Sequence, residues 1–117
     1  MSYVDGFLLA VPTANKQAYH DFASKAADVF IKHGALHVVE PWGDEIPDGQ
    51  HTDFKMSVKA TPDETVVFSW IMWPSKEVRD AGMKSFMEDP LMQEMSDMPF
   101  DGKRMIYGGF KPLIDRR

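Results

Sequence analysis

Two polar residues in apolar segments are the candidates for acid–base chemistry in this sequence, His33 and Glu40. His33 falls on the apolar stripe of a predicted helix, in its last turn, where the helix C-terminus favours a protonated imidazole. Glu40 lies in an apolar stretch beside Pro41 and Trp42, and an inward side chain there would have a raised pKa. The alternatives are a half-buried histidine bonded to a carboxylate or carbonyl group, and a glutamate that points outward as an ordinary strand charge. We take both as candidate catalytic residues.

A second group of chemically capable side chains follows a predicted turn at residues 99–102. Asp101, Arg104 and Tyr107 surround the mouth of a predicted strand, where an arginine can hold a carboxylate or phosphate through two parallel hydrogen bonds. Lys103 and Arg104 point to opposite faces of a strand, so one pocket receives at most one of them. The alternative is that Asp101 caps the turn while the cations meet water or the acids of a partner. We take Asp101, Arg104 and Tyr107 as candidate ligand-binding residues.

The histidines are weak candidates for a metal site. His33 and His37 have the spacing of a helical metal-binding pair, but Gly34 ends the predicted helix between them. Completing a site would require Glu40 or His51 as a further ligand. The acidic residues of the loop at 43–51 lack the spacing of a calcium-binding loop. We therefore expect no bound metal, and we expect no other cofactor.

Length and composition place these residues in one domain, residues 1–117. The chain has 44% hydrophobic and 26% charged residues, enough apolar side chains for a core. Its net charge of -5 argues against binding to a nucleic-acid backbone, and the absence of cysteine excludes disulfides and thiolate chemistry. The apolar run Phe7–Val11, preceded by Asp5, is too short and too acidic for a secretory signal or a membrane span. The sequence predicts a cytoplasmic protein with no membrane contact.

Apolar periodicity divides the chain into alternating strands and helices. The run at 66–73 is apolar at nearly every position, which is typical of a strand covered on both faces. Period-two alternation at 54–59 predicts an extra hairpin strand, and Thr13 or Asn15 can cap the first helix. The predicted strands are 3–11, 35–42, 54–59, 66–73 and 103–110, and the predicted helices are 13–33, 75–89 and a short turn at 91–95.

This order of elements predicts an α+β fold, a ferredoxin-like split βαβ sheet with an extra hairpin strand. The strands at 3–11 and 66–73 would occupy the centre of the sheet, and both helices would pack on one face. The opposite face would expose Phe68, Trp70 and Met72, or else the residues that alternate with them. A patch of this size on a monomer is an association site. We therefore expect a twofold homodimer joined through the sheet face, with an interface of about 2,000 Å² or more.

The chain also resembles the YbaA-like family of small bacterial proteins, catalogued as a domain of unknown function. The resemblance covers nearly the whole length and is carried by YVDGF at 3–7, HGAL at 33–36, PDG at 47–49, PSKEVRDA at 74–81 and MPFDGKRMIYGGF at 98–110. It implies a dimeric α/β-barrel, ferredoxin-like in each subunit. In that wider superfamily, which includes cofactor-free monooxygenases, ligands usually lie between the sheet and the helices of one subunit.

We expect a protein that binds a small anionic or aromatic molecule between sheet and helices, with or without cofactor-independent acid–base or oxygenase-type chemistry. In this hypothesis His33 or Glu40 moves a proton. Arg104 holds an anionic group and Tyr107 donates a hydrogen bond, while the methionines between 83 and 105 line the pocket or simply fill the core. The alternative is a non-enzymatic interaction or stress-response module, and RNA binding ranks last. Convergence of His33, Glu40 and Arg104 on one enclosed pocket would favour chemistry, and if these side chains point to different surfaces the enzyme hypothesis fails.

Overall fold

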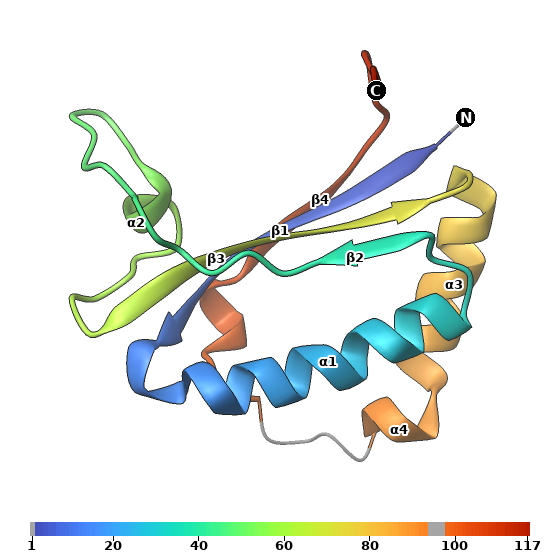
Figure 1. Cartoon of the computed structure of the whole chain (residues 1–117), viewed down its shortest axis with the longest axis horizontal. Helices are drawn as coiled ribbons and strands as arrows, with labels where there is room; N and C mark the ends of the chain where they lie inside the picture. The colour runs from blue at the N-terminus through green and yellow to red at the C-terminus, as the bar shows by residue number, and fades with distance from the viewer. Residues whose placement is uncertain (1, 94–97) are drawn as a thin grey trace.

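The sheet has four antiparallel strands in the order β2-β3-β1-β4 (Figure 1). The computed structural model describes residues 2–93 and 98–117. β1 (Tyr3–Pro12) and β3 (Glu64–Trp73) form the centre and pair along their whole length. β2 (His37–Val39) lies at the outer edge of β3, and β4 (Ile106–Phe110) lies beside β1. This order confirms the predicted split βαβ, ferredoxin-like sheet, with the two most apolar strands inside.

Both long helices cover the same face of this sheet (Figure 1). α1 (Lys16–Lys32) ends before Gly34, whose φ of 110° is the left-handed conformation that glycine favours. α3 (Lys76–Glu88) is capped by Ser75, whose hydroxyl accepts a hydrogen bond from the Val78 N–H. α4 (Pro90–Gln93) is a single turn, and residues 94 and 95 of the turn predicted at 91–95 lie outside the described residues.

The start of α1 differs from the sequence prediction because neither candidate cap performs that role. A 3₁₀ turn, η1 (Thr13–Asn15), leads directly into the helix, so its carbonyl groups meet the first helical N–H groups. The Thr13 hydroxyl lies 2.7 Å from the Thr65 hydroxyl, and the Asn15 amide donates to the Pro99 carbonyl over 3.3 Å. Both side chains therefore connect the helix start to distant segments.

The extra hairpin strand predicted at 54–59 is wrong, because this segment forms the short helix α2 (Phe54–Ser57). Asp53 caps it by accepting hydrogen bonds from the N–H groups of Met56 and Gly49. The alternation that suggested a strand has another cause. Phe54 stacks on Phe68, with ring centroids 6.4 Å apart, while Val58 is buried with Ala10 and Val66.

Two strands are shorter than predicted. The segment predicted at 35–42 pairs as β2 only over His37–Val39, followed by an isolated bridge between Trp42 and Val67. The segment predicted at 103–110 begins as η2 (Gly102–Arg104), because the Asp101 carboxylate accepts the Lys103 N–H and holds a tight turn. A local side-chain cap therefore replaces strand pairing at the start of β4.

The alternation of β3 assigns its residues to the two faces of the sheet. Val67, Ser69, Ile71 and Trp73 are buried beneath the helices. We call the opposite side of the sheet the open face. It carries Phe68 and Met72 together with the residues that pair with them on β1, and Phe68 is 45% exposed. The open face comprises Val4, Leu8, Phe68, Trp70, Met72, Ile106 and Phe110. Of the two arrangements left open by the sequence, the structure selects the one that exposes Phe68.

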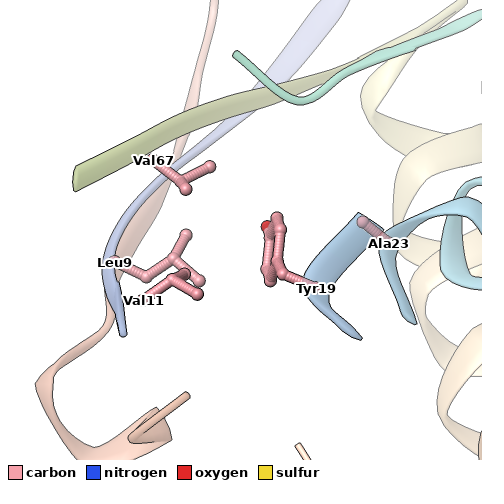
Figure 2. Packing of buried hydrophobic residues seen from close by; sticks show 5 residues of the cluster. All are labelled: Leu9, Val11, Tyr19, Ala23 and Val67. Atoms are coloured by element: carbon pink, nitrogen blue, oxygen red, sulfur yellow. The ribbon is translucent and has the colours of Figure 1, made fainter. Parts of the chain in front are cut away.

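The core beneath α1 comes from side chains of both layers (Figure 2). Leu9, Val11 and Val67 rise from the central strands and face Tyr19 and Ala23 of the helix. A second buried cluster, formed by Tyr3, Ala35, Ile71 and Trp73, lies near the other end of the sheet. The space bordered by both clusters is the cavity described next.

Candidate functional site

An inner cavity of about 400 Å³ lies between the sheet and the helices. Most of its lining is aromatic or thioether: Phe7, Phe22, Phe30, Phe86, Phe100, Met87, Met92, Met98 and Met105. The polar side chains in its described lining are Tyr19, Glu40, Ser69 and Gln93. Met95, another of the predicted methionines, lies outside the described residues. An apolar space with a few polar groups on its wall is the usual form of a small-molecule site.

Tyr19 and Glu40 form a hydrogen-bonded pair in the wall of this cavity. Tyr19 lies on the buried side of α1, where its ring joins the core with Leu9 and Val67 (Figure 2). Its hydroxyl donates to Glu40 Oε1 over 2.5 Å. Glu40 directly follows β2, so the edge of the sheet carries its side chain to the helix. The pair therefore joins the two layers at the point where the cavity is polar.

Burial shifts both members of this pair toward their uncharged forms. Desolvation raises the pKa of Glu40 and outweighs the opposite effect of hydrogen bonds from Tyr19 and Ser69. Burial, and then the adjacent Glu40 charge, raises the pKa of the Tyr19 hydroxyl well above its ordinary value. By surface area Glu40 is nevertheless an exposed residue, and it lines both this cavity and a second one described next. Tyr19 thus remains a hydrogen-bond donor, and Glu40 is the group that can take up a proton.

An outer cavity of about 230 Å³ lies on the other side of this pair, between α1 and the segment that contains β2. It shares Tyr19, Ala23 and Glu40 with the inner cavity. Its remaining lining is more polar: Lys16, His20, Ser24, Ala27, Val38 and Trp42. The Lys16 ammonium lies 5.5 Å from the centre of the Trp42 ring. The two cavities therefore meet at the Tyr19–Glu40 pair but differ in chemistry.

His33 lies away from both cavities and is bonded to a carboxylate. Its Nε2 is 2.7 Å from Asp89 Oδ2, and the Lys32 ammonium approaches the same oxygen at 3.2 Å. Asp89 also accepts the Leu91 N–H at the start of α4. The hydrogen bond with His33, followed by that with Leu91, holds the pKa of Asp89 at about 2. This geometry is the one expected of a histidine that anchors the turn between α3 and α4.

The three predicted ligand-binding residues lie near β4, outside the inner cavity. Arg104 donates to both oxygens of Glu64 and to Asp101, so its guanidinium is occupied by acids of the same chain. The Arg104 hydrogen bond is the main reason that the pKa of Glu64 falls to about 2. Tyr107 is 74% exposed, although its ring lies 6.3 Å from that of Phe7, which lines the cavity. Their ligand-binding roles stay predictions.

The predicted site residues do not converge. Glu40 lines the inner cavity, whereas His33 meets Asp89 and Arg104 meets Glu64 at other places on the molecule. A joint acid–base site of His33, Glu40 and Arg104 is therefore not supported by the geometry. The polar partner of Glu40 is Tyr19, which was not among the predicted site residues. A tyrosine on the apolar stripe of a helix needs a partner for its hydroxyl, and that requirement was the available signal.

The described residues contain no group of three or more histidine, aspartate or glutamate side chains able to hold a metal ion. His33 contacts Asp89, and neither His37 nor His51 joins it in such a group. None of the described helices combines the length and apolarity needed to cross a membrane.

Sequence comparisons identify relatives along nearly the whole chain. A family model described as Protein of unknown function (DUF1428) matches residues 2–102. The chain is 59% identical over 116 residues to the uncharacterized protein YbaA of Escherichia coli strain K12, covering 98% of this chain and 99% of the relative. The protein of the same name from Shigella flexneri shows the same identity and coverage. These matches confirm the YbaA-like resemblance noted from the sequence.

Solved structures show the same fold at low sequence identity. A variant of SnoaB, a cofactor-independent oxygenase from Streptomyces nogalater, has a TM-score of 0.57 and 12% identity, covering 97% of this chain and 95% of that one. Rv0793 from Mycobacterium tuberculosis has a TM-score of 0.53 and 8% identity, with full coverage (100%) of both chains. These likenesses confirm the predicted α+β, ferredoxin-like fold of the chain.

Proposed function

We propose that this protein binds a small, largely apolar molecule in the inner cavity. The chain belongs to the family described as Protein of unknown function (DUF1428). The observation that carries this proposal is an aromatic-lined cavity of about 400 Å³ with the Tyr19–Glu40 pair in its wall. Such a volume suits a small ligand, and phenylalanine rings favour aromatic ligands. Methionines adapt their shape to different apolar molecules, which permits a range of related ligands.

Glu40 gives this binding site the means for proton transfer. A carboxylate with a raised pKa, held beside an apolar cavity, can remove a proton from an acidic O–H or C–H group of a bound molecule. The Tyr19 hydroxyl holds the carboxylate in place and remains protonated throughout. SnoaB, which shares the fold, is described as a cofactor-independent oxygenase. In chemistry of that type, the carbanion left by deprotonation would combine with dioxygen and take back the proton, giving a hydroperoxide.

A neutral naphthyl probe tests the binding proposal. N-phenyl-1-naphthylamine becomes fluorescent in apolar surroundings, and we expect the protein to bind it with a rise in melting temperature. Ala26 lines the inner cavity, so Ala26→Phe should fill the space and weaken binding about tenfold or more. Ala18→Phe, on the exposed side of the same helix, should bind like the wild type. Circular dichroism shows whether each variant folds. Absence of binding to the wild type, or equal binding by a folded Ala26→Phe variant, would overturn the proposal.

The second candidate function is assembly, and the open face favours it. We propose that the open faces of two copies pack together, forming a cytoplasmic homodimer. Phe68, Ile106 and Phe110 are 45%, 45% and 59% exposed on this face, and Phe54 of α2 extends the patch at 46% exposure. Large contiguous apolar surfaces of this kind are association sites. A dimer that binds nothing in the inner cavity would be an interaction or stress-response module, and the net charge of -5 speaks against RNA as its partner.

A further inference from the structure

We infer that the ligand carries an anionic group, which Lys16 and His20 hold in the outer cavity while the apolar body occupies the inner cavity. The inference rests on the proposed function and extends it to the class of ligand, an apolar or aromatic molecule with a carboxylate or similar acidic group. The two cavities share three lining residues, so they adjoin at the Tyr19–Glu40 pair, and a molecule bound across both would lie against this pair.

The polar side chains that we assign to the anionic group come from a single face of α1. Lys16 and His20 are separated by about one helical turn, and Ser24 follows them on the same stripe. All three line the outer cavity, and none lines the inner one. The outer cavity thus offers hydrogen-bond donors and positive charge where the inner cavity offers rings.

Trp42 lines the outer cavity opposite α1 and holds the ammonium group of Lys16 beside it. The distance of 5.5 Å between Lys16 Nζ and the ring centre is that of a cation–π contact. The contact holds the flexible lysine side chain beside the cavity, so less conformational entropy is lost when a ligand binds. Lys25, a lysine farther along α1, does not line either cavity and serves below as the comparison.

The acidic groups around the outer cavity are compatible with an anionic ligand. Asp21 accepts a hydrogen bond from Gln17 over 3.0 Å and lies 3.4 Å from His20 Nδ1, on the exposed side of the helix. Glu40 is the acidic side chain in the described lining. Because burial raises its pKa, Glu40 can accept a proton and donate a hydrogen bond to a neighbouring anion.

Two fluorescent probes with the same ring system test the inference. 1-Anilinonaphthalene-8-sulfonate carries an anionic sulfonate, and N-phenyl-1-naphthylamine lacks it. Lys16→Met should weaken binding of the sulfonate probe about tenfold and leave the neutral probe within about twofold of wild type. His20→Gln should shift the same ratio in the same direction. Ala27 lines only the outer cavity, so Ala27→Phe should also weaken the sulfonate probe selectively.

Lys25→Met is the matched control, since it removes the same charge from the same helix away from the cavity. If Lys16→Met and Lys25→Met have equal effects, the outer cavity does not recognise the anion and the inference is overturned while the proposed function stands. The same holds if both probes respond equally to Lys16→Met. If the neutral probe fails to bind the wild type, the proposed function itself is overturned, and this inference with it.

Discussion

At the scale of single residues, Glu40 differs from other acidic side chains of this protein in what surrounds its carboxylate. Glu64 receives two hydrogen bonds from Arg104, and Asp89 meets His33 and Lys32, so the pKa values of both fall to about 2. Glu40 instead receives hydrogen bonds from hydroxyl groups beside an apolar cavity, and its pKa rises. Positively charged partners stabilise the ionised form of Glu64 and Asp89, whereas among the described residues none forms an ion pair with Glu40. A readily protonated carboxyl at a cavity is therefore a local property of this position.

The raised pKa of Glu40 predicts how stability depends on pH. Because folding favours the protonated carboxyl, the wild type should lose stability relative to Glu40→Gln as pH rises above 4.5, the ordinary value of the group. Below that pH the two proteins should have similar free energies of unfolding, since both are then uncharged at this position. Urea denaturation between pH 4 and about 8 measures the difference.

Glu45→Gln, in an exposed loop, controls for the loss of one negative charge. If the wild type gained stability over Glu40→Gln as the pH rose, the carboxylate would be favoured by folding and the assignment of Glu40 as a proton acceptor would be wrong.

At the scale of elements, the close contact between α3 and β3 depends on a residue without a side chain. Gly82 is buried against the ring of Trp73, and an added Cβ would lie 2.6 Å from the His33 carbonyl oxygen. The same tryptophan donates from its ring N–H to Asp5 over 2.9 Å. The Asp5 carboxylate also accepts hydrogen bonds from two nitrogens of Arg79 on α3. This ion pair with the buried Asp5 connects the helix to the sheet.

Gly82→Ala should therefore destabilise the protein, although alanine normally stabilises a helix relative to glycine. We expect a loss of about 2 kcal/mol in the free energy of unfolding, because the methyl group must displace Trp73 or the helix. Lys84→Ala, at an exposed position of the same helix, should change stability by less than about 0.5 kcal/mol. Chemical denaturation compares the two variants. An unchanged or more stable Gly82→Ala protein would show that the helix can move away without cost.

The elements were predictable from the sequence where many residues contribute to one pattern. The run at 66–73 identified β3, and the turn residues Gly34 and Ser75 marked helix boundaries correctly. The strand predicted at 54–59 is wrong because three alternating apolar residues are compatible with a helical turn packed on the sheet as well as with a strand. Of the candidate site, the sequence predicted Glu40 and, as one of two alternatives, the methionines of the lining. The contacts of His33 and Arg104 join residues far apart in the chain, and no local pattern reports such pairs.

At the scale of the whole molecule, the two sides of the sheet have different surroundings. One side is covered by the helices (Figure 1). The cavities lie on that side, while the other side carries exposed aromatic and aliphatic side chains. Ligand binding and self-association are thus assigned to opposite sides of one sheet. A substitution on the open face should therefore alter assembly and leave the side chains that line the inner cavity in place. The two faces are connected where β1 and β3 contribute residues to both.

Phe68→Asp should convert the proposed dimer to a monomer. A charge in the centre of a packed apolar interface is costly to bury, so the variant should sediment as a 13.3 kDa species and the wild type at twice that mass. Ile31→Asp is the matched control, because Ile31 is 50% exposed on α1, on the other side of the molecule. Analytical ultracentrifugation measures both. A monomeric wild type, or a Phe68→Asp dimer of unchanged affinity, would contradict assembly through the open face.

The pairing of β1 with β3 also sets an order of events when the chain is made. Tyr3 pairs with Trp73 and Pro12 with Glu64, so the first strand has no central partner until more than half of the chain has left the ribosome. α1 can form early because its backbone hydrogen bonds are local, whereas the sheet must wait for a long loop to close. During that interval the apolar side chains of β1 are without their final cover. Nascent chains of this protein should therefore depend on chaperones or on slow, uninterrupted synthesis in the stretch that precedes residue 73.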